Sequence, residues 1–334
     1  MYYVGLDVHA CQIEMCVLER GGQVVRRKGV RTLAAAIREV RGLDGPAAVC
    51  FEASQGAGFV RDALRKVAQR VVVANPSRLA MISRSKRKND RNDAEWLAKM
   101  LILDLVPECH IPEVDVRAWR QAIEHRRRLL KRRTGLKAAI RSHLRAYGKA
   151  AGRGLWTKAG LAWLADEAFP DELAERRRDV LMKELADAEA ALRLMTQALD
   201  AKAKKHPGVA LLMTIPGVGV RTAEAVMAYV DDPTRFARVR QAGTYFGLVP
   251  QQDQSARVNR LGHITRQGPS VVRWLLTEAV WQGIRRSEKL RRHYERVLKG
   301  DPDRRKIAAV ATAHFLSRAM VAMLKSGETW DEAA

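Results

Sequence analysis

The sequence is short of acidic residues, and this deficit bounds the kind of partner it can have. It contains 37 aspartates and glutamates against 60 lysines and arginines, which gives a formal net charge of +23 and a pI near 10.4. Such an excess of positive charge favours a polyanionic partner, of which nucleic acid is the simplest. The 334 residues are 47% hydrophobic, so the chain can still build two or three domains with proper cores.

Cysteines and long apolar runs are scarce as well. The four cysteines (Cys11, Cys16, Cys50 and Cys109) lack zinc-ligand spacing, so we expect reduced core residues in a cytoplasmic, nucleoid-associated protein. No apolar run approaches the ~18 residues of a membrane-spanning helix, and the start, MYYVGLDVHA, has no signal-peptide layout. We therefore expect no membrane partner.

The first part of the chain, residues 1–110, mixes strand and helix patterns. The predicted elements, in order, are strands 2–9, 12–18 and 23–30, helix 33–40, strand 47–51, helix 59–67, strand 71–74, a basic loop 78–88 and a helix after Asp90. Three meandering strands followed by helix, strand, helix, strand and helix is the order of an α/β RNase H-like (RuvC-like) domain. We predict that fold here.

Four carboxylates fall where this fold would bring them to one sheet edge. Asp7 lies inside the first strand, where a buried acid is costly unless a cation pairs with it, and Glu52 ends a buried strand. Asp90 and Asp93 are three residues apart and share one face of a helix. Oxygen-rich clusters suit Mg²⁺ or Mn²⁺, which can assist phosphoryl transfer. We predict that these four acids bind Mg²⁺, with Mn²⁺ as the alternative.

Each acid taken alone also fits a structural role. Aspartates are favoured at helix starts, so Asp90 and Asp93 fit a helix cap. Asp7 fits a hydrogen-bond acceptor at a strand end, and Glu52 fits a helix-capping acid. Only the set of four in this strand order favours the metal site.

The middle of the chain, residues 111–206, is basic and helical. Residues 117–149 predict one long helix that carries twelve lysines and arginines and a single acid, Glu124. We expect this helix to bind nucleic acid, although a basic helix that faces protein fits too. The residues assigned to that contact are Arg126, Arg127, Arg128, Lys131, Arg132 and Arg133. A second helix, 171–205, carries an apolar heptad seam, which predicts a coiled-coil hairpin with the first helix or a dimer contact.

Residues 207–334 predict a mainly helical C-terminal domain. Within it, 211–230 contain an apolar helix, Gly217 and Gly219, and a second helix. This pattern is typical of a helix-hairpin-helix, in which the glycines let the backbone approach a phosphate. A plain turn between two helices fits it equally well.

A polar segment, 251–260, is predicted as a loop that contains Ser255. The serine hydroxyl could act as a nucleophile, because nearby arginines could bind a phosphate and stabilise developing charge. Those arginines are Arg257, Arg260 and Arg266. A serine that only forms loop hydrogen bonds is the simpler interpretation of the residue by itself.

The order of short motifs resembles one family of transposases. GLDVHA, FEAS, KNDRNDAEWLA, IPGVG, GLVP and HITRQG follow one another within residues 3–285. This order resembles the DEDD transposases of insertion sequences, which are bridge-RNA-guided recombinases. The resemblance implies an N-terminal RuvC-like domain, a coiled-coil middle and a C-terminal transposase domain that carries a nucleophilic serine.

The resemblance also implies roles for individual residues and partners. It makes metal-binding carboxylates of Asp7, Glu52, Asp90 and Asp93. The nucleophile would be Ser255, although this chain has Ser-Ala where the family usually has Ser-Gly, so Thr265 and Ser270 remain alternatives. The implied partners are donor and target DNA and a structured non-coding bridge RNA. A covalent phosphoserine–DNA intermediate and a site shared between protomers imply a homo-oligomer, at least a dimer, with a tetramer expected.

We therefore expect an RNA-guided DNA recombinase of a mobile element, and two alternatives stay open. A RuvC-like domain acting alone would be a junction-resolving nuclease that uses metal-activated water. A non-enzymatic scaffold, in which the acids only cap a helix and pair with Lys86–Lys88, would bind nucleic acid without Mg²⁺. Only the recombinase predicts covalent protein–DNA adducts.

Overall fold

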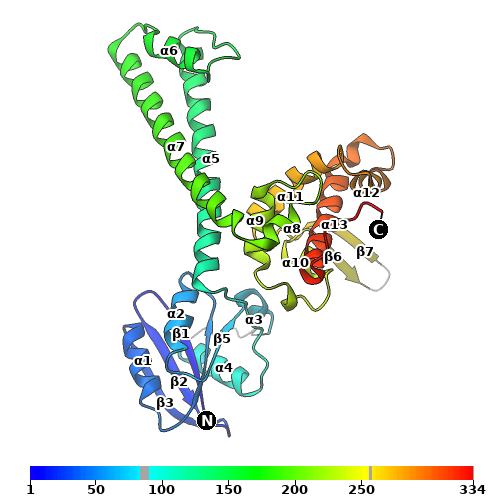
Figure 1. Ribbon diagram of the computed structural model, residues 1–334. Coiled ribbons are helices and arrows are strands. Elements are labelled where there is room, and N and C mark those ends of the chain that lie inside the picture. The colour runs from blue at the N-terminus through cyan, green and yellow to red at the C-terminus, as the bar shows by residue number, and fades with distance from the viewer. Residues whose placement is uncertain (83–89, 256–257, 334) are drawn as a thin grey trace. The chain divides into compact units, whose positions relative to one another are not determined.

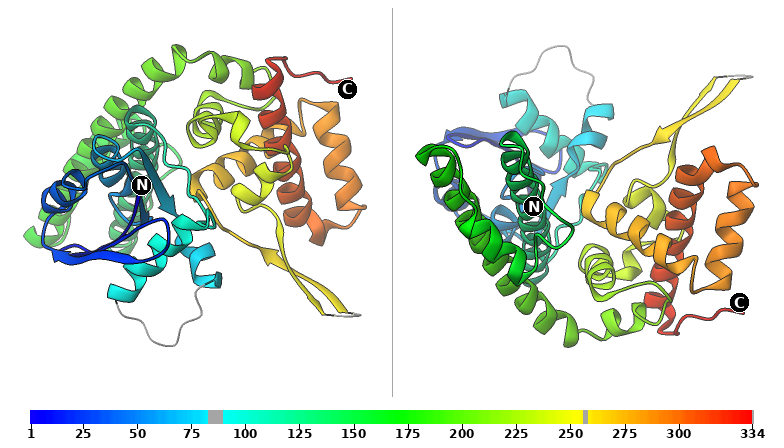
Figure 2. Two further views of the ribbon diagram at one scale, coloured as in Figure 1. Left: turned by 90° about the horizontal axis from the view of Figure 1, so that it is seen from below. Right: turned by 90° about the horizontal axis from the view of Figure 1, so that it is seen from above.

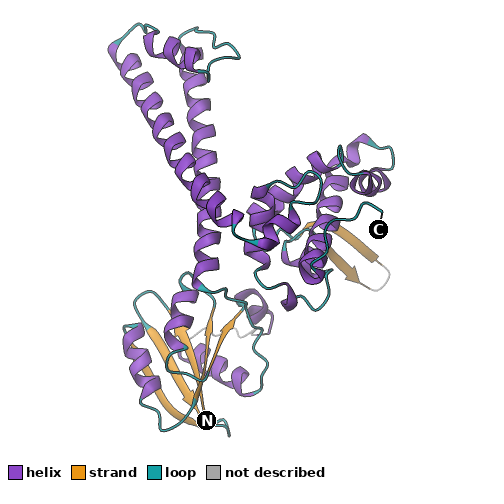
Figure 3. Ribbon diagram, viewed as in Figure 1, coloured by secondary structure: helices purple, strands orange, loops and turns teal. Residues whose placement is uncertain are grey.

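The computed structural model describes residues 1–82, 90–255 and 258–333. They form two compact units, Met1–Val114 and Asp115–Ala334, whose elements are labelled in Figure 1. The first unit is an α/β domain. The second is helical apart from one two-stranded ribbon (Figure 3).

The first unit contains a five-stranded sheet in the order β3-β2-β1-β4-β5. Its elements are β1 (Tyr2–Val8), β2 (Ile13–Leu18), β3 (Val24–Val30), α1 (Leu33–Arg41), β4 (Ala47–Glu52), α2 (Ala57–Leu64), β5 (Arg70–Ala74), α3 (Pro76–Ile82) and α4 (Asp90–Ile102). Strands β1, β2 and β3 are antiparallel neighbours, whereas β4 runs parallel to β1 and β5 parallel to β4. The predicted order of strands and helices is confirmed, with α3 forming where a loop was expected.

Helices cover both faces of this sheet. Val49 and Phe51 of β4 pack on one face in a core with Leu64 of α2. The alternate residue of β4, Cys50, packs on the other face with Leu97 of α4. This period-two alternation follows from strand geometry, and it tells which side chains of β1 and β4 face α4.

The backbone of α4 lies directly on β1 at Gly5. A Cβ atom built on Gly5 would lie 1.8 Å from the carbonyl oxygen of Ala94 and 2.8 Å from the backbone nitrogen of Ala98. No side chain larger than hydrogen fits between this strand and this helix. The small residues Ala94 and Ala98 complete the close contact, because they are buried against Cys16 and Leu18 of β2.

The second unit begins with two long helices. Its elements are α5 (Val114–Ala146), α6 (Lys158–Asp166), α7 (Glu172–Lys204), α8 (Pro207–Leu212), α9 (Val220–Val230), η1 (Pro233–Arg235), α10 (Gln241–Tyr245), β6 (Pro250–Ser255), β7 (Val258–Ile264), α11 (Ser270–Gly283), α12 (Glu288–Leu298), η2 (Pro302–Arg304) and α13 (Arg305–Ser326). Helices α5 and α7 run antiparallel and side by side, with α6 at their far end (Figure 1). Leu185, Leu192 and Leu199 of the expected apolar seam are buried.

Both ends of the α5–α7 pair are closed by apolar clusters. At the far end, Leu144 of α5 and Leu185 of α7 pack with Leu164 of α6. At the near end, Ile123 of α5 and Leu199 of α7 belong to the large core of the C-terminal helices. The helix pair is therefore anchored at both ends.

Helix α13 is a core helix of this unit. The helix Pro302–Ser326 contains an 18-residue window with a mean hydropathy of 1.6, so by length and composition it is apolar enough to cross a membrane. It is longer than the apolar runs expected from the sequence. However, half of the window is buried, and Leu316 and Met320 are fully enclosed in the core with α9 and α11.

The polar segment expected as a loop forms instead an antiparallel ribbon of β6 and β7. Gln252 pairs with Leu261 and Ser255 pairs with Val258. The ribbon extends away from the helices of its unit (Figure 2). Gln251, Arg260 and His263 are exposed, so the ribbon does not show the apolar alternation by which a half-buried strand is recognised in a sequence.

Replacing Gly5 should destabilise the first unit. Gly5→Ala would force α4 off β1, and such overpacking costs about 1–3 kcal/mol or more. Gly21→Ala is the matched control, because no atom lies within 4 Å of the position of its Cβ. Hydrogen exchange of peptides from β1 and α4 should show faster exchange in the first variant alone. Equal protection in both variants would contradict the close-contact interpretation.

Candidate functional site

Asp7 lies near the carboxyl end of β1, the central strand of the sheet. Its side chain is 16% exposed, and its Oδ2 atom lies 3.0 Å from Nε2 of His9. Gly5 faces α4, and Asp7 is two residues further along the same strand. Asp7 is therefore on the α4 face of the sheet.

Glu52 lies beside Asp7 on the neighbouring strand. In the parallel pairing of β1 with β4, Leu6 is opposite Phe51, so each acid is the next residue beyond this pair. Cys50 faces α4, and Glu52, two residues later, faces the same side. Glu52 is exposed at the end of its strand, where ligands of open α/β sheets bind.

Helix α4 brings the other two acids to the same end of the sheet. It runs antiparallel to β1, because Ala94 lies over Gly5 while Ile102, at its other end, packs near Tyr3. The start of α4 is therefore close to the carboxyl end of β1. Asp93 is partly buried one residue before Ala94, and Asp90 is the first residue of the helix. The side chain of Asp90 and the basic segment Arg84–Lys88 lie outside what the structure describes.

The donor set suits a hard divalent cation. All four predicted ligands offer carboxylate oxygens, which Mg²⁺ and Mn²⁺ prefer over nitrogen and sulfur. Among the side chains that the structure describes, which exclude that of Asp90, no three His, Cys, Asp or Glu residues form a group that could hold a metal ion. The placement on one face at one end of the sheet nevertheless fits the predicted ligands Asp7, Glu52 and Asp93.

Two polar residues beside Asp7 are absent from the predicted site. Glu14 is directly opposite Asp7 on β2 and is only 8% exposed. The Oε1 atom of Glu14 accepts a hydrogen bond from Gln12 at 2.5 Å. The same atom would lie 2.8 Å from a Cβ built on Gly29. His9 contacts Asp7 directly. Counting strand pairs back from the 9–12 turn would have placed Glu14 opposite Asp7.

Ser255 is the last residue of β6 and pairs with Val258. It is thus near the free end of the ribbon, but its side chain is outside the described part of the chain, as is the whole of Arg257. Arg260 is exposed on β7. Arg266 is exposed in the turn after β7, with a φ of 54°.

The base of the ribbon is held rigidly where two turns cross. Gly247 and Gly268 have φ values of 66° and 73°, and a Cβ on either would lie 2.1 Å from a carbonyl oxygen of the opposite turn. The Nη1 atom of Arg273, on α11, donates hydrogen bonds to the carbonyl oxygens of Phe246, Gln267 and Gly268 at 3.1, 2.7 and 3.0 Å. The crossing therefore requires glycine at 247, in the GLVP motif, and at 268, in the HITRQG motif.

The two alternative hydroxyls differ in accessibility. The Oγ1 atom of Thr265 is buried, and no hydrogen-bond partner for it lies in the described residues. Ser270 is exposed at the start of α11. A buried hydroxyl cannot reach a DNA phosphate, so Ser270 is the better alternative to Ser255.

Part of the positive charge of α5 is neutralised within the chain. Arg132 lies 3.6 Å from Glu184, and Lys137 lies 3.3 Å from Glu189, both on α7. Arg127 contacts Glu124 at 3.1 Å. Acids of α7 thus neutralise part of the charge of this helix.

The other side chains of α5 that are predicted to contact nucleic acid differ in their accessibility. Arg128 and Lys131 are exposed and form no ion pair within the ranges that the structure describes. The Nε atom of Arg133 is buried, and the Nε atom of Arg126 donates to Thr196 at 2.9 Å. Arg128 and Lys131 are therefore the predicted residues most available to phosphate.

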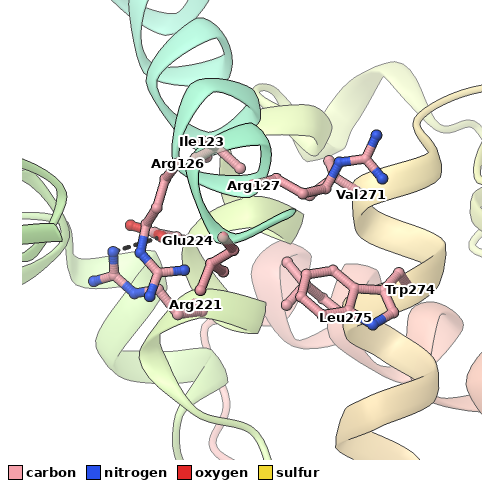
Figure 4. Close-up of a pocket in the computed structure, with 9 residues that line it drawn as sticks. Ile123, Arg126, Arg127, Arg221, Glu224, Val271, Trp274 and Leu275 are labelled. Carbon is pink, nitrogen blue, oxygen red and sulfur yellow. Dashed lines mark ion pairs between the residues drawn. The ribbon is translucent and has the colours of Figure 1, made fainter. Parts of the chain in front are cut away.

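A buried ion cluster lies where α5 crosses α9 and α11. Figure 4 shows Arg126 reaching from α5 toward Arg221 and Glu224 of α9, whereas Arg127 points toward Val271. Glu224 is 1% exposed and lies 3.0 Å from Arg221. Burial raises the pKa of Glu224 to about 7, against the opposing effect of Arg221. The cavity beside it, about 20 Å³, is the size of one water molecule, so this pocket is part of the packing.

Gly217 and Gly219 have different surroundings. Gly217 has a φ of 90°, and its Cβ would lie 2.5 Å from the backbone nitrogen of Gly283 on α11. Packing alone thus requires a glycine at 217. Gly219 is exposed, precedes α9, and has no atom within 4 Å of a built Cβ, so only Gly219 has room for a ligand.

Comparisons with known proteins point to transposases. A family model described as "Transposase" of the DEDD type matches residues 4–149, and the model "Transposase IS116/IS110/IS902 family" matches residues 209–295. The transposase for insertion sequence element IS1111A of Coxiella burnetii is 28% identical over 279 residues, which are 82% of this chain and 75% of that protein. A probable family 20 transposase of Pseudomonas aeruginosa is 26% identical over 96% of both chains.

The raised pKa of Glu224 predicts a pH-dependent stability. Between its ordinary value of 4.5 and about 7, Glu224 ionises in the unfolded chain but stays protonated in the folded one. Folding stability therefore falls as pH rises through this range, by roughly 3 kcal/mol at most. Chemical denaturation should show Glu224→Gln gaining stability over wild type between pH 4.5 and 7.5. A difference that is constant with pH would contradict the assignment.

Proposed function

Because the chain belongs to the IS116/IS110/IS902 family of transposases, we propose that it is the RNA-guided recombinase of an insertion sequence. Transposases cut and rejoin DNA. The observation that carries the proposal is the placement of Asp7, Glu52 and Asp93 on one face, at one end of one sheet. These three residues lie within residues 4–149, the region that the DEDD transposase model matches.

We assign the nucleophile to Ser255. Its hydroxyl oxygen attacks a DNA phosphorus, an Oγ–P bond forms, and one ester P–O bond of the strand breaks. The serine proton passes to solvent or a base, and the released strand end leaves as a hydroxyl. Attack by a hydroxyl of another strand reverses the step, so no high-energy cofactor is needed. An exposed ribbon with a rigid base supports this role, because it can present Ser255 to a duplex.

The four acids would hold Mg²⁺, with Mn²⁺ as the alternative, through Asp7, Glu52, Asp90 and Asp93. When bound, such an ion neutralises charge on the phosphodiester and on the leaving oxygen. The protein contributes the fixed positions of these carboxylates, which the contact of α4 with Gly5 supports. His9, within 3.0 Å of Asp7, would orient that carboxylate.

The second unit would bind the nucleic acids and the other protomers. We infer that Arg128 and Lys131 contact phosphates of DNA or of a structured non-coding bridge RNA, and that Gly219 does so at the start of α9 as part of a helix-hairpin-helix. Helices α5 and α7 would form a coiled-coil hairpin. Arg257, Arg260 and Arg266 would bind phosphate beside Ser255. A site that combines the acids of one protomer with the serine of another requires at least a dimer, and we propose a tetramer.

Covalent trapping tests the serine. Incubation with donor DNA and guide RNA should give an adduct that survives denaturing electrophoresis, and Ser255→Ala should abolish it. The matched control, Ser270→Ala, should retain the adduct. An adduct that persists in Ser255→Ala but disappears in Ser270→Ala would move the nucleophile to Ser270. Cleavage without any adduct would instead indicate a metal-dependent nuclease.

Substitution of the acids tests the metal site. Asp7→Asn and Glu52→Gln keep the size of the side chains but remove their charge, so recombination should fall by at least ~100-fold, since loss of charge stabilisation in a transition state has effects of this order. Glu14→Gln, also an acid on this face, should retain most of the activity. If chelation of Mg²⁺ leaves adduct formation unchanged, the site does not act through metal.

Salt dependence of binding tests the basic helix. Lys131→Ala should lower the slope of log K against log salt by about 0.9, the value for one lost phosphate contact on duplex DNA. Lys137→Ala is the matched control, because Lys137 is on the same helix but paired with Glu189. Equal slopes for the two variants would place the contact elsewhere.

A further inference from the structure

A cleft of about 340 Å³ lies between α11, α12 and the start of α13. This volume is in the range of pockets that bind small molecules. The cleft is lined by Trp281, Ile284, Arg285, Tyr294, Leu298 and Arg305. None of these residues belongs to the site assigned to DNA cleavage or to the basic face of α5.

The wall of the cleft is aromatic and fixed in place. The ring centroids of Trp281 and Tyr294 are 6.0 Å apart with an angle of 66° between the planes. Tyr294 is 8% exposed and belongs to the core of the helical body, against which Trp281 is also packed. Ile284 and Leu298 add aliphatic surface. A flat apolar ligand would meet a preformed wall here.

The rim of the cleft carries two arginines. Arg285 and Arg305 are exposed, and neither forms an ion pair or side-chain hydrogen bond within the described parts of the chain. Helix α13 begins at Arg305 directly after η2, and η2 is capped by the side chain of Asp301 and has Asp303 in its first turn. The positive charge of the rim therefore comes from the two arginine side chains and not from the helix start.

We propose that this cleft binds one unpaired nucleotide of DNA or RNA. Its base would stack on Trp281 with Tyr294 at its edge, and a flanking phosphate would lie on Arg285 and Arg305. Stacking on aromatic side chains beside a cationic groove is how proteins bind single strands without reading their sequence. A base inside a duplex could not enter, because both of its faces are covered by neighbouring bases. The inference requires only that the chain handles nucleic acid, and it is independent of the serine and of the metal site.

Binding of short single strands to the full-length protein tests the proposal. The probes are fluorescein-labelled oligothymidylate and oligouridylate, each about ten nucleotides long, within the range bound by single-strand sites, and a blunt duplex of equal length. Arg285→Ala with Arg305→Ala should weaken single-strand binding at least tenfold more than it weakens duplex binding. Comparing the affinities for oligothymidylate and oligouridylate shows whether the cleft prefers DNA or RNA.

The matched control removes the same charge from outside the cleft. Arg292 and Arg296 lie on α12 and do not line the cleft, so their double alanine variant should weaken both probes to a similar, smaller extent. Trp281→Leu should reduce single-strand binding about 5- to 160-fold, the range for one lost stacking contact, whereas Trp281→Phe should retain most of it. Thermal unfolding by circular dichroism shows whether each variant is folded.

Three results would overturn the proposal. Equal losses in the cleft variant and the control would show that only net charge matters. Unchanged binding by a folded Trp281→Leu protein would exclude stacking. If polyglutamate displaces the labelled single strand from the wild-type protein but not from Trp281→Leu, the cleft binds an acidic peptide instead. None of these results affects adduct formation by Ser255, so failure here and failure of the recombinase assignment are distinguishable.

Discussion

The contact between Gly5 and the backbone of α4 is the constraint on which the candidate catalytic site depends. A carbonyl oxygen of the helix occupies the place where any other residue would have a Cβ. This close contact fixes the distance between α4 and the sheet. Because α4 runs antiparallel to β1, Asp93 lies at the carboxyl end of β1. Asp7 and Glu52 reach that end through strand register alone. Carboxylates that are to share a cation must be positioned to within a fraction of an ångström, and backbone contact is stiffer than contact through flexible side chains.

In the second unit, the main constraint is the strong positive charge of helix α5, which must be held in a folded chain. Two acids of α7 form ion pairs with bases of α5: Glu184 pairs with Arg132, and Glu189 pairs with Lys137. These pairs are at least partly exposed, and each contributes little to stability. Apolar clusters at both ends of the helix pair supply most of the stabilisation. The ion pairs instead decide which bases remain available to a polyanion, and among the described residues Arg128 and Lys131 have no acidic partner.

The sheet and the placement of Asp7, Glu52 and Asp93 at one of its ends could be predicted because they depend on local patterns. Buried parallel strands are continuous apolar runs, and their ends are marked by the first acid, as at Glu52. The ribbon of β6 and β7 could not be predicted in this way, since its sequences, PQQDQS and VNRLGHI, contain no continuous apolar run and its anchor is Arg273, far along the sequence from Phe246. Likewise, the burial of Glu224 and the pairing of Arg127 depend on which helices cross. Periodicity gives the faces of a helix but not its neighbours.

The same limit explains why composition could not tell which bases of α5 are exposed and gave no indication of the cleft beside α13. A count of bases treats all of them as equivalent, whereas the fold neutralises some, encloses others and exposes a few. Arg285 and Arg305 are 20 residues apart in the sequence and become one cationic rim only when α11 and α13 pack around Tyr294. Free positive charge matters most where it borders apolar surface, because only there can a ligand gain from ionic and stacking contacts at once. By that criterion the cleft beside α13 is notable because the fold, and not spacing in the sequence, brings its two arginines to one apolar wall.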